Sequence, residues 1–386
     1  MSKRIMFGMV LLLLTFQMFG QNEKDERNWT LNGYVKNLQS IYKIDGFDSY
    51  LIDQLVHNRL NFNWFPSDHL NIRVEMRNRL FYGDFVKLTP NYGDRVEAAN
   101  NDVFDLSFHW QESDASVINS TLDRIFFEFN KNNWEVRVGR QRINWGISNV
   151  WNPNDVFNAF AFTDFDYEER PGSDAIRVKY YTGVASSVEV AANAASTWDQ
   201  RVAAILFKWN AFQYDFQILS GIANNEFVIG GGWAGNLGNA GFKGEGSFFT
   251  PLEGIQKSSF TFTLGADYSF ANGVYAGIGY LYNSNGTTKG TLADLFSFEL
   301  SAKNLYPFRN AIFISSSYPV TPLVNAVLSI IYSPVSARPL FINPTITWSI
   351  AQNWDLDLVG QIAYNRTGDK YLSPISAVFI RLKVSF

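Results

Sequence analysis

The sequence predicts an all-β protein: a transmembrane antiparallel β-barrel of about 18 strands, with 16 also compatible, after a cleaved signal peptide. Three observations favour this fold. Apolar and polar residues alternate over segments of about 10 to 15 residues, longer than the ~5–6 residues of ordinary soluble strands. Aromatic residues recur near the ends of these segments. Short connections alternate with long ones, as turns and external loops do in outer-membrane barrels.

The N-terminus predicts a signal peptide. Lys3 and Arg4 precede a short apolar run, residues 5–16, whereas a membrane-spanning helix needs ~20 residues. We therefore expect residues 1–20 to be a signal peptide and residues 21–386 to form a single barrel domain. An uncleaved membrane anchor is the alternative.

The alternation is clearest in 71-NIRVEMRNRLFY-82, 258-SSFTFTLGADYSF-270 and 374-PISAVFIRLKVSF-386. In a barrel the apolar face meets lipid and the polar face lines the lumen. In a soluble sandwich the apolar face packs inward, so alternation alone does not separate the two. The aromatic residues that suit an interfacial girdle are Trp29, Trp64, Phe65, Trp134, Trp348, Trp354 and Phe386.

The alternating segments predict strands at 28–43, 51–65, 69–83, 116–130, 134–145, 173–182, 185–193, 200–209, 212–221, 226–235, 239–248, 257–269, 273–283, 309–320, 323–333, 339–349, 353–364 and 374–386. An even strand number puts both ends of the barrel on the periplasmic side. Pro344 lies inside one segment and indicates a bulge or a strand end, because proline has no N–H for a ladder.

Basic residues gather on the polar faces of the first six strands and of the last strand, which must pair with the first to close a barrel. We expect them to form one contiguous basic wall of the lumen. Its pore-lining or substrate-binding members are Arg59, Arg73, Arg77, Arg79, Arg124, Arg137, Arg140, Arg142, Arg177, Lys179, Arg381 and Lys383. The alternation slips at Gly139, where a bulge would turn Arg140 and Arg142 inward.

Two interpretations of this wall stay open. It can guide anions through a pore, as ladders of Arg and Lys do. It can also be structural, because acidic residues of the same strands are available as partners: Glu75, Asp123, Glu128 and Glu135.

The connection 146–172 contains more aromatic residues than a solvated loop needs, together with turn-forming Asn-Pro and Asn-Asp pairs. We expect it to fold inward as a constriction loop. Its anchoring residues are Trp145, Trp151, Asn152, Asp155, Phe157 and Phe160. Packing outside as a cap is the alternative. The acidic run 164-DFDYEE-169 lacks the spacing of a known cation loop, so we expect a solvated surface there and no metal site.

The run 139-GRQRINWG-146 followed by 151-WNPNDVFN-158 resembles a motif of outer-membrane porin-like proteins with long polar loops. The whole mature chain is similar in architecture to the alginate-export and substrate-specific porin group. That resemblance implies 18 strands, an Arg-rich lumen and an inward-folded loop, with Arg140 and Arg142 as candidates for lumen positions. It raises the expectation of a polyanionic or acidic solute.

Several classes of protein are disfavoured. The net charge of −4 and the pI near 5.5 give no reason to expect a nucleic-acid partner. Without cysteine there is no disulfide framework or thiolate metal site. No hydrolase motif is present, and Ser107 near His109 is better explained by chance than by catalysis. We therefore expect no enzyme activity and no cofactor.

The sequence thus predicts a porin-like channel of the bacterial outer membrane for passive passage of small or anionic solutes, such as acidic sugars or an oligosaccharide. Its expected partners are the membrane lipid and the barrel-assembly machinery, which would engage the last strand ending at Phe386. The sequence specifies no oligomeric state. The alternative is a closed barrel whose surface loops serve polysaccharide anchoring or secretion assembly. An outer-membrane hydrolase is less favoured.

Overall fold

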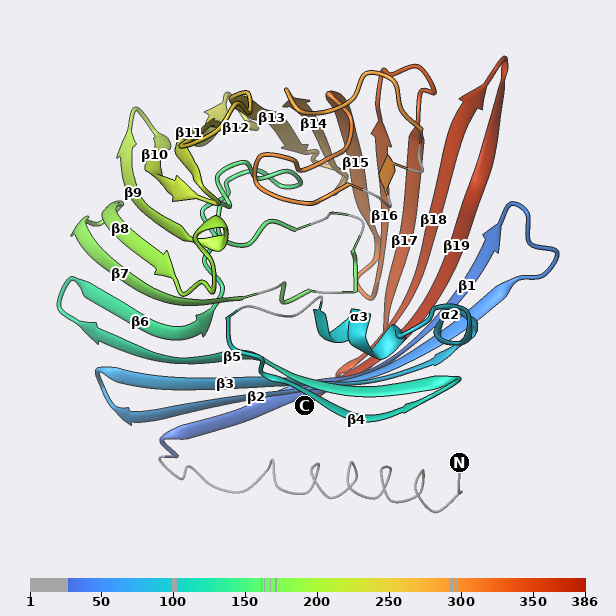
Figure 1. Ribbon diagram of the computed structural model, residues 1–386, viewed down its shortest axis with the longest axis horizontal. Helices are drawn as coiled ribbons and strands as arrows, with labels where there is room; N and C mark the ends of the chain where they lie inside the picture. The colour runs from blue at the N-terminus through green and yellow to red at the C-terminus, as the bar shows by residue number, and fades with distance from the viewer. Residues whose placement is uncertain are drawn as a thin grey trace.

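The computed structural model describes residues 27–98, 103–160, 162, 164–166, 168–170, 172–291, 294–295 and 298–386. The predicted signal peptide lies outside these residues. One antiparallel sheet closes on itself, because β1 (Trp29–Ile44) pairs with both β2 (Leu51–Ser67) and β19 (Lys370–Ser385). Figure 1 shows the resulting ring of strands. Within the described residues the wall has 18 strands, which confirms the predicted fold.

In chain order the remaining elements are β3 (Leu70–Gly83), α2 (Asp84–Leu88), α3 (Tyr92–Ala98), β4 (Ser107–Ser113), β5 (Ser116–Lys131), β6 (Trp134–Gln141), β7 (Ser173–Gly183), β8 (Ser186–Asn193), the short 3-10 helix η1 (Trp198–Gln200), β9 (Val202–Ala211), β10 (Tyr214–Ala223), β11 (Glu226–Leu237), β12 (Ala240–Pro251), β13 (Ser259–Ser269), β14 (Tyr275–Asn283), β15 (Asn310–Thr321), β16 (Val324–Tyr332), β17 (Leu340–Ala351) and β18 (Trp354–Thr367). None of the helices in the described residues is long and apolar enough to cross a membrane.

The predicted strands match these bounds closely, with three differences. The extra strand β4 lies in the expected loop 84–115 and pairs with the part of β5 that β6 no longer contacts. β6 ends at Gln141 instead of residue 145, because the chain then turns into the lumen. β19 begins four residues earlier than predicted and forms a tight turn with β18.

Outward-facing side chains form an apolar belt. On β5, Ile125, Phe127 and Phe129 are exposed, whereas Phe126 between them is buried. One end of the barrel carries the short turns and the first and last strand ends; we call it the short-turn end, and the opposite end the long-loop end. Exposed aromatic side chains ring the short-turn end: Trp29, Trp64, Trp134, Tyr180, Trp348, Trp354 and Phe386. An exposed apolar surface of this extent, bordered by aromatic residues, is typical of contact with lipid.

Two irregularities in the wall have clear causes. The register between β3 and β5 shifts so that Asp123 is an extra residue on β5. We also predicted a separate bulge at Gly139, but the pairing of β6 with β5 and with β7 is continuous there, so that prediction was wrong. Gly139 instead has φ +121, a conformation that suits glycine. At Pro344 the ladder with β18 is interrupted, and the side-chain amide of Asn343 donates to Gly360 O at 2.6 Å in place of a backbone N–H.

Candidate functional site

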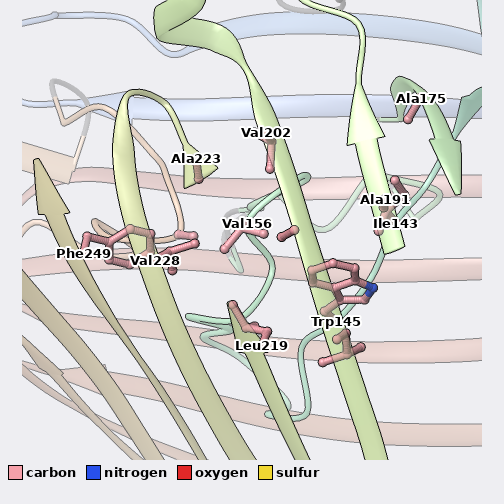
Figure 2. Close-up of a cluster of buried hydrophobic side chains, with 13 residues drawn as sticks. Ile143, Trp145, Val156, Ala175, Ala191, Val202, Leu219, Ala223, Val228 and Phe249 are labelled. Atoms are coloured by element: carbon pink, nitrogen blue, oxygen red, sulfur yellow. The ribbon is translucent and has the colours of Figure 1, made fainter. Parts of the chain in front are cut away.

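The described residues of the connection between β6 and β7, residues 142–172, fold into the barrel (Figure 1). We call this connection the inner loop. Its first part packs Ile143, Trp145 and Val156 against inward-facing residues of β7 to β12, among them Leu219 (Figure 2). Its central part places Trp151 against Tyr306 and other residues that follow β14. Apolar burial therefore fixes the loop along the inside of the wall.

Polar contacts fix the backbone of the inner loop as well. Asp155 Oδ1 accepts from the N–H groups of Trp145 at 2.6 Å and Gly146 at 3.0 Å. Asn152 packs so tightly on Gly146 that a Cβ there would overlap its side chain. Burial raises the pKa of Asp155 to about 6, although the two N–H groups and nearby arginines favour the ionised form.

Carboxylates of the barrel wall accept hydrogen bonds from the first part of the inner loop. Trp145 is 1% exposed and its Nε1 donates to Glu189 of β8 at 2.6 Å. Glu245 of β12 accepts from the N–H groups of Ile147 and Ser148, both at 3.2 Å. These two inward-facing carboxylates were not singled out from the sequence, because only the folded loop brings an indole N–H to Glu189 and backbone N–H groups to Glu245.

Basic residues of the predicted wall lie on the adjacent strands β19, β2, β3 and β5, with Lys36 of β1 between β19 and β2. Two neighbouring rows of directly paired residues form its centre. They are Lys383, Lys36, His57, Arg79 and Asn119 in one row, and Tyr34, Arg59, Arg77 and Thr121 in the other. The prediction that the closing strand joins the first strands in one arc thus agrees with the pairing of β19 with β1.

Most members of this arc have carboxylate partners. Arg59 is 1% exposed and lies 2.5 Å from both Glu75 and Asp123. Arg77 lies 3.3 Å from Asp123, which the β5 bulge supplies. Farther along the wall, Arg137 pairs with Glu128 and Glu135, and Arg177 pairs with Glu135. The structural interpretation of the wall is therefore correct for much of it.

The other expected pore-lining residues differ in exposure. Arg73 and Lys383 keep part of their side chains accessible, 42% and 19%. Arg79 donates to Asn119 at 2.9 Å. Lys179 lies over the ring of Tyr181.

Arg140 and Arg142, the two arginines of the porin-like motif, are not equivalent. Arg140 is 3% exposed and bonded to Asp174 and to the carbonyl oxygen of Phe104. These bonds link Arg140 of β6 to β7 and to the segment before β4, at the point where β6 stops pairing with β5. Arg142 is partly exposed in the inner loop. The guanidinium groups of Arg142 and Arg170 both lie over the ring of Phe160.

The acidic run 164-DFDYEE-169 docks on the basic wall. Asp166 lies 2.8 Å from Lys36, Glu168 lies 3.0 Å from Lys383, and Glu169 accepts from Tyr34 at 2.8 Å. The expectation of a solvated surface was therefore wrong, because the folded loop brings these carboxylates to partners on β1 and β19 that are at least 130 residues away in sequence. Within the described residues, no group of three metal-ligating side chains gathers as a metal site.

Two of the cavities that the described residues form border the inner loop toward opposite ends of the barrel. One of about 800 Å³ opens at the long-loop end, between β1 to β3, β18, β19 and the loop segment around Phe165. Its wall is mainly apolar and aromatic. The other, of about 410 Å³, lies at the short-turn end and is lined by Ile147, Lys179, Lys208 and Trp209. Among the described residues, neither lysine forms an ion pair with a carboxylate. Sequence reasoning missed Lys208, which alternation alone places in the lumen.

A closed wall of 18 strands, an apolar exterior and a loop folded into the interior define a transmembrane β-barrel of the outer-membrane type. No protein-family model matches the chain, and no curated protein matches it. Among solved structures it resembles a BenF-like porin from Pseudomonas fluorescens Pf-5, with TM-score 0.59 and 9% identity over 93% of this chain and 99% of that chain. Pseudomonas aeruginosa OccK11 has TM-score 0.57 and 10% identity over 93% and 96%. P. aeruginosa OpdK with vanillate has TM-score 0.56 and 8% identity over 92% and 98%. The chain therefore has the porin fold, as the sequence predicted.

Proposed function

We propose that this protein is a channel of the bacterial outer membrane for passive passage of small or anionic solutes, including acidic sugars. The proposal rests on the arrangement of the inner loop and the cavities inside the barrel. A buried, anchored loop borders two separate cavities that lie toward opposite ends of the barrel. A loop fixed in this way sets the width of a pore, and charged side chains beside it set ion preference.

The preference for anions rests on the accessible cations. Arg73 and Lys383 on the wall, and Lys179 and Lys208 in the short-turn cavity, remain partly exposed. A narrow, low-dielectric passage strengthens the field of such charges. OpdK, whose fold is similar, has a solved structure with vanillate. Vanillate is a small carboxylate, which supports anionic solutes as the class that this channel passes.

The test is the single-channel conductance of the refolded protein in a planar bilayer, with the reversal potential in a salt gradient. We expect discrete, anion-selective steps. The double variant Lys179→Gln and Lys208→Gln should weaken the anion preference, because it removes two cavity charges without stranding a carboxylate partner. Lys131→Gln, at the exposed last residue of β5 at the same end, should leave the preference unchanged. Flat current from a demonstrably folded barrel would instead favour a closed barrel that acts through its surface loops.

A further inference from the structure

Asp166 and Glu168 of the acidic run occupy a site that is formed by cationic side chains where β19 pairs with β1. Glu168 lies 3.1 Å from Arg381 and 3.0 Å from Lys383. Asp166 lies 2.8 Å from Lys36 and 3.5 Å from Arg381. Lys36 is fully buried and also donates to the carbonyl oxygen of Asp166 at 2.7 Å. The contacts are those of a ligand in a binding site, with every carboxylate matched to at least one cation.

The charges of this site balance only while the acidic run is in place. Its three cations are Lys36, Arg381 and Lys383. Their partners are Asp166 and Glu168 of the inner loop and Asp357 of β18, which lies 2.9 Å from Arg381. Without the two loop carboxylates, two positive charges of the lumen wall would be unmatched. The inner loop therefore masks a site whose own chemistry is that of an anion receptor.

The rim of the site is reachable from the lumen. The Glu168 side chain is 38% exposed, and those of Arg381 and Lys383 are 13% and 19% exposed. Burial alone would raise the pKa of Glu168, but the hydrogen bond and charge of Lys383, and then Arg381, hold it below its usual value. Glu168 is therefore ionised at neutral pH and competes as an anion for these two cations.

We propose that Asp166 and Glu168 act as an internal ligand: they occupy a carboxylate-binding site formed by Lys36, Arg381 and Lys383, and a solute with two or more carboxylates competes with them for it. A single carboxylate replaces only one of the two internal partners, so a polycarboxylate is the better competitor. The inference rests on the proposed channel function, and it identifies the wall site that such a solute would use.

The experiment compares succinate with acetate as blockers of the single-channel current. The key variant is Glu168→Gln, which removes a carboxylate from Arg381 and Lys383 and leaves Lys383 without its ion pair, while Asp357 still compensates Arg381. We expect the succinate concentration for half block to fall roughly tenfold, since a hydrogen bond to a charged group is worth at least that much. Acetate should gain less. Asp369→Asn removes one negative charge from a fully exposed loop side chain and should change neither value.

A charge-swap variant distinguishes succinate binding by the wall cations from the structural role of the ion pair that holds the loop. In the double variant Glu168→Lys and Lys383→Glu the ion pair between positions 168 and 383 is kept with its charges exchanged, and Asp166 still holds the loop to Lys36. The contact of position 168 with Arg381 becomes repulsive, and the wall now carries a carboxylate at position 383. Succinate block should be lost although the channel conducts. Current with equal succinate block in wild type and Glu168→Gln would overturn the internal ligand and leave the channel intact. Absence of current in every folded variant would overturn the channel itself.

Discussion

Asp155 is the residue through which pH should act on the inner loop. Its carboxylate is 1% exposed, and burial raises its pKa to about 6. A raised pKa in the folded state means that the folded protein binds the proton more readily than the unfolded chain does. The resulting stability is fully present below the unfolded pKa, near 3.8, and is lost as the pH rises through about 6.

The corresponding prediction concerns resistance to denaturant. A shift of about two pKa units corresponds to about 3 kcal/mol, so the contribution of Asp155 to the free energy of unfolding should fall by up to that amount between pH 4 and pH 7. Asp155→Asn should remove this part of the pH dependence, because its amide oxygen can still accept the two backbone N–H groups that Oδ1 accepts in the wild type but does not titrate. The measurement is the unfolding midpoint in urea from lipid vesicles at both pH values. Parallel pH profiles for the two proteins would contradict the assignment.

Arg59 is the residue on which the centre of the basic wall depends. It lies between Glu75, Asp123 and Glu169 and is 1% exposed. Arg59→Gln would strand buried carboxylates, and losing one partner of a buried ion pair costs about 3–5 kcal/mol. The same unfolding assay should therefore show a large loss. Arg366→Gln, which removes an exposed loop pair, should cost less than about 1 kcal/mol. Similar losses in both variants would contradict the role of the buried network.

At the scale of elements, the strands could be predicted because each face of a barrel strand meets a different medium and the sequence alternates accordingly. The aromatic content of the inner loop likewise indicated burial. The docking of the acidic run could not be predicted, because it depends on which strands become neighbours in space. β4 was missed for a related reason: its pairing partner exists only because β6 leaves β5 early.

The inner loop should determine conductance through its Trp145 anchor. Trp145→Ala removes a buried indole and the hydrogen bond to Glu189, and large-to-small changes of this kind cost ~3–5 kcal/mol. We expect the loop to loosen and the single-channel current to become larger and noisier. Trp198→Ala, at a site 73% exposed, is the control and should conduct as the wild type does. Unchanged current in Trp145→Ala would show that the loop does not limit the pore.

For the whole molecule, the sequence predicted a contiguous basic arc because a barrel must close and the last strand must pair with the first. It did not predict how the arc is neutralised. Arg137 and Arg381 look alike in the alternating pattern, but Arg137 is paired with carboxylates of the wall and Arg381 also with the inner loop. Charge balance in the lumen is a property of the closed barrel and its loop together.

The same closure gives two neighbouring residues of β19 opposite environments, which can be tested with one substitution. Arg381 faces the lumen beside Asp357, whereas Ile380 is 40% exposed on the apolar belt. Ile380→Arg would place a charge in lipid, and the cost near the midplane of the bilayer is about 2–4 kcal/mol. Folding into lipid vesicles, followed by the shift of the folded form on an unheated gel, should show this loss, whereas Ile380→Val should fold as the wild type does. Tolerance of arginine at position 380 would mean that this face does not contact lipid, and the chain would then not span the membrane in the orientation that its belt indicates.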